Sequence, residues 1–507
     1  MAQTPRTPSK NVVLIMTDQH NAACTGYENH PQALTPHLDR LAEQGTRFRH
    51  AYTPNPICLP TRVSLLSGQY CQNHGYYGLT GPTPTHLPSF LGHFRAHGYA
   101  TAAIGKLHLP KDPRGWARED CDVYHDTLAN DGEGMAYRNY LKRVGFAGEV
   151  DARCLPEFPE KGNYTFEARP SRMPFEHSIE GFTNQQSLHF MDEAVARGQP
   201  FCMEVSYHRP HQVYTPAQAF WDLYDDDLEL PPFALDDSPG RPPHFLETVA
   251  ENLSTQGLYE PKDLEARMRR VWKGYLACVS HCDHAVGQVL DHLTELGVAD
   301  DTIVVYTADH GAYSGTFGLS EKAPGICSEQ VCRVPYLWRV PGVAKENLRV
   351  DELAHLVDLA PTAASLAGLP AMDWVDGVDL SPWLRGGDGP IRGAAVTENP
   401  WSKSVRWDRW RLVHYQPEMF PGQDLGELYD LEADPWERNN LYADPAHAQT
   451  LNHGRRLLLE WLIDTRRPVT TWPNLLRDGQ PVPQARDGKQ SNAYTPDARR
   501  SLTLNYL

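Results

Sequence analysis

Two strongly apolar, β-branched runs constrain the fold of this chain most. NVVLIMTD at residues 11–18 and DTIVVYTADHG at residues 301–311 are apolar at successive positions, which is typical of strands buried on both faces of a parallel sheet. The runs YATAAIGK and PFCMEVSYH between them alternate with amphipathic helical segments. This alternation predicts an α/β fold in which helices cover both faces of a mostly parallel sheet.

The pattern changes near the motif LSPWLRGGDGP. Short alternating strand-like runs such as AAVTEN follow it, and an amphipathic helical segment, AHAQTLNHGRRLLLEWLIDTR, comes after them. We therefore expect a large domain over residues 1–387 and a smaller C-terminal α+β domain over residues 388–471. Residues 472–507 are polar and are expected to be disordered or to form an arm on a neighbouring subunit of a homo-oligomer. Two Pro-rich stretches, 110–180 and 229–262, are expected to be surface insertions.

Composition excludes several classes of partner. The net charge is −17 and the basic residues form no run, which argues against nucleic acid and anionic membranes. The first ten residues lack the apolar stretch of a secretory signal, and no early apolar run is long enough to cross a bilayer. The ten cysteines are sparse and form no CxxC pair. Together these features favour a cytoplasmic protein.

Polar residues that could bind a metal follow two of the predicted strands. Asp18 and Gln19 come after VVLIMT, and Asp309 and His310 come after TIVVYTA. In open parallel sheets, ligands bind beyond the carboxyl ends of the strands. Any one of these residues alone is more often a helix cap or a loop acceptor. Two pairs at two strand ends indicate an oxygen-rich site suited to Ca²⁺, Mg²⁺ or Mn²⁺.

The segment CLPTR places a cysteine and an arginine at the start of a predicted helix. Pro60 fits the first turn of a helix, and Cys58 and Arg62 are four residues apart, so they share one face. The positive end of the helix dipole would add to the guanidinium charge and favour an oxyanion. A catalytic thiolate, a metal ligand, half of a disulfide and an inert buried cysteine all remain open for Cys58 at this point.

Further basic residues follow other predicted strands. Lys106 and His108 in GKLHL are two residues apart, so on a strand they would point to the same side. His208 and His211 lie in SYHRPHQVYTP, and Lys322 lies in GLSEKAPG. Each of these could equally be a solvated surface residue.

The charges at these strand ends suggest an anionic ligand. Asp18 and Asp309 would balance one divalent cation. Arg62, Lys106 and Lys322 would then be left without a counter-charge. A cation about 4 Å from an anion contributes roughly 4 kcal/mol at an effective dielectric constant of about 20, before desolvation. An anionic ester is the natural ligand of such a site.

These motifs together resemble the type I sulfatases of the alkaline phosphatase superfamily. CLPTRVSLLSG is similar to the family's C-x-P-x-R signature, and the likeness continues, in order along the chain, through MTDQ, GKLHL, HRPHQ, TADHG, GLSEK, RVPYLWRVPG and ELYDLEADPWERNNL. The resemblance implies an alkaline phosphatase-like fold with a large mixed, mostly parallel sheet. It also implies that residues 1–387 form the catalytic domain.

The resemblance further implies roles for individual residues. Cys58 would be converted to formylglycine (3-oxoalanine) by a maturation enzyme, and its hydrated aldehyde would be the nucleophile, with Arg62 beside it. Lys106 and Lys322 match lysines that hold sulfate oxygens. His211 matches a leaving-group contact or general acid, and His108 matches the base that regenerates formylglycine. The implied ligands of one divalent cation are Asp18, Gln19, Cys58, Asp309 and His310.

Two departures from the common sulfatase pattern affect the predicted metal and substrate. Asp18-Gln19 replaces paired aspartates, and Asp309-His310 replaces Asp-Asn, which is more like choline sulfatases and phosphonate monoester hydrolases. With fewer carboxylates and one imidazole, Mn²⁺ rivals the expected Ca²⁺. Lys106 and His108, in contrast, resemble sulfatases.

Three hypotheses about activity follow. The first is a cytoplasmic sulfatase that hydrolyses small-molecule sulfate monoesters. The alternative is a phosphonate monoester or phosphodiester hydrolase that uses the same site, because tetrahedral oxyanions of similar size are difficult for one pocket to separate. The third, from a different class, is an unmodified and catalytically silent binding protein.

Overall fold

The computed structural model describes most of the chain, apart from the two termini and several internal segments. The predicted arm, 472–507, lies outside the described residues except for two short strands of two residues each, β13 Leu476–Arg477 and β14 Gln480–Pro481. None of the described helices is both long and apolar enough to cross a bilayer. The described residues are 10–79, 87–110, 116–127, 134–149, 151, 167–231, 240–255, 261–322, 326–465, 476–477 and 480–481.

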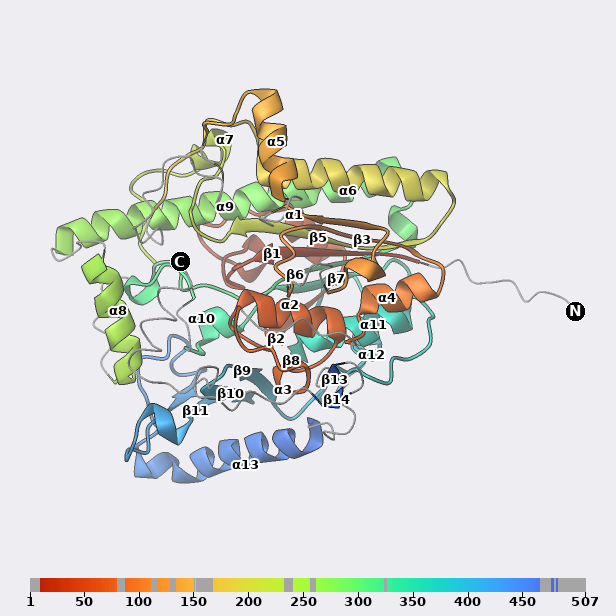
Figure 1. Cartoon of the computed structure of the whole chain (residues 1–507). Helices are drawn as coiled ribbons and strands as arrows, with labels where there is room; N and C mark the ends of the chain where they lie inside the picture. The colour runs from red at the N-terminus through yellow and green to blue at the C-terminus, as the bar shows by residue number, and fades with distance from the viewer. Residues whose placement is uncertain are drawn as a thin grey trace, which may run out of the picture.

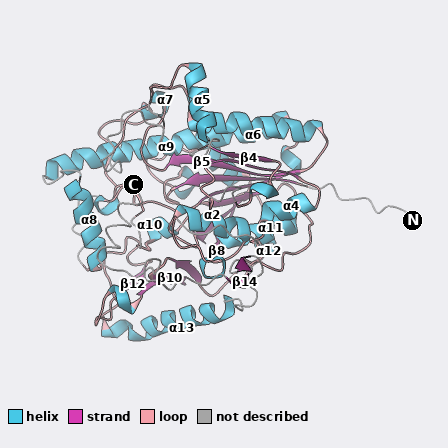
Figure 2. Ribbon diagram, viewed as in Figure 1, coloured by secondary structure: helices cyan, strands magenta, loops and turns pink. Residues whose placement is uncertain are grey.

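A large mixed, mostly parallel sheet forms the centre of the molecule, as predicted (Figure 2). Within the described residues it has eight strands in the order β4-β3-β5-β1-β6-β7-β2-β8. Only β7 runs antiparallel to its neighbours in this sheet. The strands are β1 Asn11–Asp18, β2 Thr46–Tyr52, β3 Ala100–Gly105, β4 Val123–Asp126, β5 Phe201–Pro210, β6 Thr302–Ala308, β7 Tyr336–Arg339 and β8 Leu348–His355.

Helices cover both faces of this sheet (Figure 1). One layer contains α1 Pro36–Glu43, α6 Ile179–Ala196 and α9 Pro261–Glu295. The other contains α2 Cys58–Ser67, α4 Phe90–Ala96, α11 Leu359–Leu366 and α12 Ser381–Leu384. The remaining described α-helices are α3 Cys71–His74, α5 Gly134–Val144, α7 Gln218–Trp221, α8 Pro243–Thr255, α10 Glu329–Cys332 and α13 Ala448–Thr465.

The position of strand β1 between two helical layers explains why its sequence is apolar at almost every position. Val12, Leu14 and Met16 pack into the core that includes residues of α2, α4 and α11. Val13 and Ile15 point the other way, into the core shared with α1, α6 and α9. Each fully buried side chain of this kind contributes about 1.5–3 kcal/mol of transfer free energy. A central strand between two helical layers therefore needs apolar residues on both faces.

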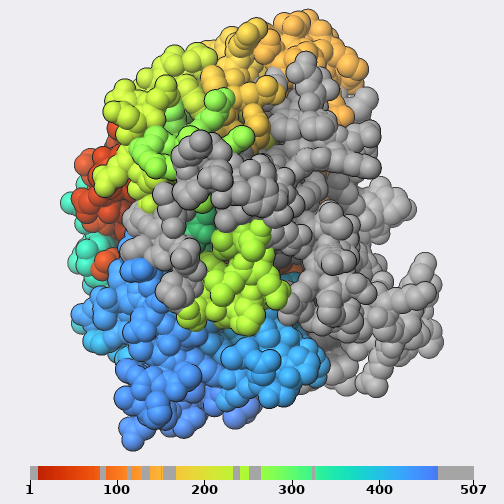
Figure 3. All heavy atoms as spheres, turned by 90° about the vertical axis from the view of Figure 1, so that its left-hand side faces the viewer, coloured from red at the N-terminus to blue at the C-terminus, as the bar shows by residue number. Residues whose placement is uncertain are grey.

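A smaller antiparallel sheet follows in the C-terminal part, in the order β12-β11-β10-β9. Helix α13 packs on this sheet, and Gly454 lies so close to the Trp407 ring that a Cβ there would collide with it. Figure 3 shows that this part of the chain (blue) and the segment that precedes α8 (orange to yellow-green) share one face of the molecule. The predicted limits of the domains stay a prediction. The strands are β9 Ala395–Glu398, β10 Ser402–Trp407, β11 Trp410–Tyr415 and β12 Gly426–Asp430.

Candidate active site

The carboxyl ends of β1 and β6 bring the two predicted ligand pairs together. The two strands are adjacent and parallel, with Thr17 opposite Ala308, so Asp18 and Asp309 leave the sheet side by side. Gln19 has a left-handed backbone, with φ 69°. Its N–H donates to Asp309 Oδ1 over 3.0 Å, which fixes the turn that follows β1.

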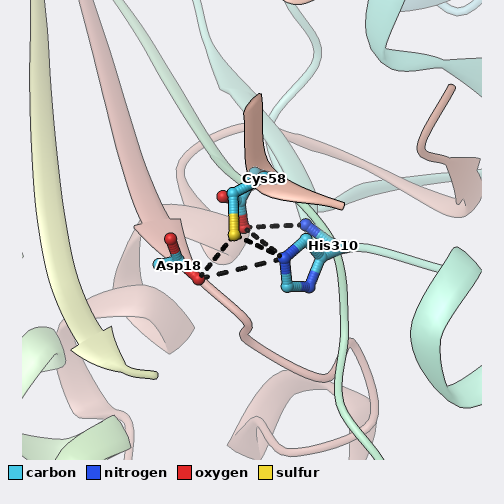
Figure 4. A group of neighbouring side chains, drawn as sticks. Asp18, Cys58 and His310 are labelled. Atoms are coloured by element: carbon cyan, nitrogen blue, oxygen red, sulfur yellow. Dashed lines mark hydrogen bonds and ion pairs between the residues drawn. The ribbon is translucent and has the colours of Figure 1, made fainter. Parts of the chain in front are cut away.

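Cys58 joins these residues at the first turn of α2. Its Sγ lies 3.1 Å from His310 Nε2 and 3.7 Å from Asp18 Oδ1, and Figure 4 shows the three side chains pointing toward one another. One donor atom from each of Asp18, Cys58, Asp309 and His310 lies within 4.8 Å of the others, and all four residues are buried. The predicted meeting of position 58 with ligands from both ends of the chain is therefore present in the structure.

The second nitrogen of His310 fixes which ring atom faces the cluster. Nδ1 lies 2.9 Å from the Gly311 carbonyl oxygen, which can only accept, so Nδ1 carries a proton. In the neutral ring, Nε2 then presents its lone pair toward Cys58 and the two carboxylates. Such a carbonyl partner is the usual way in which a ligating histidine is held.

Arg62 lies among the two carboxylates and orients them. Its Nε donates to Asp309 Oδ2 over 2.9 Å, and its Nη2 contacts Asp18 Oδ2 at 3.2 Å. Nη1 donates to Ser206 Oγ over 2.8 Å and to the Lys106 carbonyl oxygen. With each nitrogen of the guanidinium engaged by protein, Arg62 holds the Asp18 and Asp309 carboxylates in place.

The strand expected to run through GKLHL ends earlier, so the predicted placement of Lys106 and His108 on one strand face is wrong. Strand β3 ends at Gly105, whose φ is 116° and where a Cβ would collide with the Ser206 carbonyl oxygen. The chain turns there, and His108 has φ 47°, so alternation along a strand cannot relate it to Lys106. The buried Lys106 forms an ion pair with Asp18 Oδ2. His108 is half-buried on the following turn.

Lys322 and His211 lie beside Gln19. The Lys322 Nζ is 3.3 Å from Gln19 Oε1 and 3.5 Å from His211 Nε2. His211 Nδ1 donates to the Gln212 carbonyl oxygen over 2.6 Å, so Nε2 faces the lysine. His208 is not a solvated surface residue: it is buried on β5, and its ring centroid is 5.2 Å from that of His211.

The electrostatic field of the site stabilises an anion at position 58. Burial and the Asp18 carboxylate oppose ionisation of the Cys58 thiol. The cations Lys322 and Lys106 and the His310 ring outweigh both and lower the pKa of this thiol to about 6. At Cys24, away from the site, burial instead raises the pKa of the thiol to about 12. Position 58 is thus prepared for negative charge.

The two carboxyl groups titrate in opposite directions. Burial opposes ionisation of Asp18, but Lys106 and other nearby cations hold its pKa well below its ordinary value. Burial and the charge of Asp18 raise the pKa of Asp309. Two buried carboxylates that share a site behave in this way because their charges repel, and a bound cation would remove the conflict.

Sequence reasoning missed two residues of the site. Ser206 bonds to Arg62 and to the Lys106 carbonyl oxygen, and Glu204 lies two residues earlier on the same face of β5. Burial raises the pKa of Glu204 from 4.5 to about 7, although Arg62 opposes this shift. The signal was a glutamate and a serine inside MEVS, within the apolar first half of a central strand.

Comparison with known proteins agrees with this site. The Sulfatase family model matches residues 10–369, and a model described as the C-terminal part of N-sulphoglucosamine sulphohydrolase matches residues 315–462. A choline-sulfatase of Rhizobium meliloti is 29% identical over 461 residues, covering 87% of this chain and 83% of its own length. An arylsulfatase of Clostridium perfringens is 27% identical, covering 93% of this chain and 98% of its own length.

A solved structure shows the same fold. The phosphonate monoester hydrolase of Silicibacter pomeroyi superposes with a TM-score of 0.77 at 24% identity, covering 91% of this chain and 97% of that chain. The family match extends over more than half of the sequence and includes the strand ends, the start of α2 and the Lys322 loop. The resemblance predicted from the motifs is thereby confirmed, and this chain belongs to the sulfatase family of sulfuric ester hydrolases.

Proposed function

We propose that this protein hydrolyses sulfate monoesters through formylglycine formed from Cys58 by a maturation enzyme, with one divalent cation in the site. The observation that carries the proposal is the placement of Cys58. Its side chain lies at the start of a helix, among two carboxylates and an imidazole, in a field of buried cations that lowers its pKa to about 6. A small-molecule sulfate ester is the substrate class that the curated relatives support.

The donor set fits a divalent cation. Asp18 and Asp309 supply carboxylates, His310 supplies Nε2, and Gln19 lies directly after Asp18 with its carbonyl oxygen turned toward Lys322. Hard oxygen ligands suit Ca²⁺, whereas the imidazole also suits Mn²⁺, so both ions belong in the test. When bound, the cation and the modified side chain would together supply the activated oxygen nucleophile.

The remaining residues would bind the ester and transfer protons. Lys106 and Lys322 are buried cations that act on the Cys58 side chain, which supports a role for them in holding two sulfate oxygens. His211 Nδ1 carries a proton, because the Gln212 carbonyl oxygen beside it can only accept a hydrogen bond from the ring. A second proton, on Nε2, would be the one passed to the leaving group. His108 is proposed as the base that restores the resting side chain.

The partners follow from the same features. We propose no nucleic-acid or membrane partner, because the net charge is −17. The nine cysteines among the described residues are free thiols, which supports a reducing, cytoplasmic compartment. A homo-oligomer that uses residues 472–507 is a further proposal. Sedimentation of the full chain and of a chain ending at residue 471 would test it.

Two measurements test the proposed activity. Turnover of an aryl sulfate and of a phenyl phosphonate ester with the same leaving group would be compared, in Ca²⁺ and in Mn²⁺, after removal of metal by a chelator. We expect the sulfate to react faster and activity to return only with a divalent cation. Faster cleavage of the phosphonate would assign the site to phosphonate monoesters instead.

The state of Cys58 is tested separately by mass spectrometry. Peptides from the native host should show the mass change expected when the CH₂SH group becomes an aldehyde. A wholly unmodified thiol, together with no turnover of either ester, would identify a silent binding protein and overturn the proposal.

A further inference from the structure

A chain of hydrogen bonds leads from the candidate site to a carboxylate on a separate loop. The Lys322 Nζ donates to Gln19 Oε1 over 3.3 Å. Gln19 Nε2 donates to Gln212 Oε1 over 3.0 Å, and Gln212 Nε2 donates to Glu321 Oε2 over 2.5 Å. The chain thus joins the turn after β1, the turn after β5 and the loop after β6.

The two charged ends fix the direction of every bond in this chain. An ammonium group can only donate a hydrogen bond, and a carboxylate can only accept one. Gln212 must therefore turn its NH₂ group toward Glu321 and its oxygen toward Gln19. Gln19 must then turn its NH₂ group toward Gln212 and its oxygen toward Lys322. The orientation of both amides follows from charge, not from their shape.

The backbone of Gln19 is already fixed, so its side-chain amide is the remaining freedom. The backbone N–H of Gln19 donates to Asp309 Oδ1 over 3.0 Å, and its backbone carbonyl oxygen accepts from Tyr275 Oη over 3.0 Å. A flipped amide would place an NH₂ group against the Lys322 ammonium and beside the proposed cation. The side-chain oxygen Oε1 has two lone pairs, so the hydrogen bond from Lys322 leaves one lone pair for a cation.

We propose that Gln212 and Glu321 are positioning residues that hold the side-chain oxygen of Gln19, Oε1, toward the cation site. The inference rests on the proposed function, in which Gln19 is one of the cation ligands. Gln212 is buried and Glu321 is half-buried, so the chain is largely shielded from water. Partners that orient a metal ligand in this way typically contribute roughly 10–100-fold to metal affinity.

The test measures the affinity of Ca²⁺ and Mn²⁺ for the full-length mature protein by titration calorimetry after chelator treatment. Gln212→Met breaks the chain and keeps the charge of Glu321. Glu321→Gln keeps the shape but removes the fixed acceptor. We expect each single variant to raise the apparent Kd by about 10-fold or more, with little change in melting temperature of the metal-free protein.

A double variant supplies the rescue. In Gln212→Glu/Glu321→Gln, the carboxylate at position 212 accepts directly from Gln19 Nε2, so the direction of the Gln19 amide is restored and the Kd should return to within about threefold of wild type. Glu346→Gln is the matched control, because this residue is exposed and precedes the amino end of the edge strand β8, whereas the site lies at the carboxyl ends of central strands.

The outcomes separate the inference from the proposed function. Wild-type affinity in Gln212→Met would overturn the inference, even if Glu321→Gln binds weakly, because the loss would then reflect net charge alone. A double variant as weak as Glu321→Gln would also overturn it. If the wild-type protein itself binds neither ion, the proposed metal-dependent function fails, and the inference fails with it.

Discussion

Two buried clusters of charge flank the carboxyl end of β5, and they differ in how their charges balance. The site cluster contains Asp18, Asp309, Arg62, Lys106 and Lys322. The second, here called the Arg209 cluster, contains Arg209, Asp151, Glu180 and His281. All of these side chains are almost completely buried.

The Arg209 cluster is complete without a ligand. Arg209 forms ion pairs with Asp151 and Glu180, and its Nη2 also donates to the Thr215 carbonyl oxygen over 2.6 Å. Burial and Arg209 keep the pKa of His281 well below its ordinary value, so this ring is neutral. Burial is the main cause that raises the pKa of Glu180, so one proton would neutralise the excess negative charge.

The site cluster, in contrast, gathers three cations around Cys58 and its neighbouring carboxylates, and the proposed metal would add further positive charge. A bound anion would balance this positive charge. The comparison shows that a buried charge alone does not mark an active site, because structural ion pairs are buried too. Buried cations gathered around a proposed nucleophile are the more useful indicator.

The largest expected effect is the loss of activity on removal of the proposed nucleophile. Cys58→Ala should lower kcat/KM for an aryl sulfate by roughly 10⁴-fold or more, because no neighbouring group can replace a covalent nucleophile. Steady-state kinetics and a thermal melt would be recorded together. Cys121→Ala is the control: this buried thiol lies outside both clusters, so full activity is expected there. Activity retained in the first variant would assign the nucleophile elsewhere.

A matched pair of arginine variants tests the comparison itself. Arg209→Met should lower the free energy of unfolding by about 3–5 kcal/mol, because two buried carboxylates lose their cation. Arg62→Met should instead lower kcat by roughly 10²–10³-fold through misplaced ligand carboxylates. Denaturant unfolding and the kcat per folded molecule separate the two. A larger loss of kcat in Arg209→Met than in Arg62→Met would contradict the division into a structural and a functional cluster.

Glu204 sharpens the comparison through pH. Burial raises its folded-state pKa from 4.5 to about 7, so the folded protein binds more protons than the unfolded chain within this window. Stability therefore falls as pH rises from about 4.5 to about 7 and is lowest above it. Glu204→Gln should remove about 3 kcal/mol of this pH dependence. Denaturant unfolding at about pH 5 and about pH 8 measures this dependence. The same change in the free energy of unfolding between these pH values in both proteins would refute the assignment.

The smallest effect is expected at an exposed ion pair outside both clusters. Lys273 Nζ lies 2.7 Å from Asp226 Oδ1, but the Asp226 side chain is 91% exposed. Asp226→Asn should change the free energy of unfolding by at most about 0.5 kcal/mol, because water screens such pairs. A loss as large as that of Arg209→Met would show that burial is not what separates these pairs.

Much of the fold was predictable because the pattern of each segment is local. The two-sided apolar runs at β1 and β6 predicted central strands, and the change of pattern after LSPWLRGGDGP predicted the antiparallel sheet that begins with β9. The strand predicted to continue through GKLHL, in contrast, was wrong. The strand ends at Gly105, whose φ of 116° turns the chain at a point where the Ser206 carbonyl oxygen leaves no room for a side chain. A contact with a distant strand cannot be read from five residues.

The sequence by itself determined which groups are available to the site: the strand-end pairs, Cys58 at the start of a helix, and the lysines that follow later strands. Only the tertiary structure decided how these groups are used. Arg62 is engaged by both carboxylates, Gln212 and Glu321 orient Gln19, and Arg209 is neutralised apart from the site. The physical reason is that each of these roles depends on partners from other strands and loops, and hydrogen-bond direction and charge balance exist only once those segments meet.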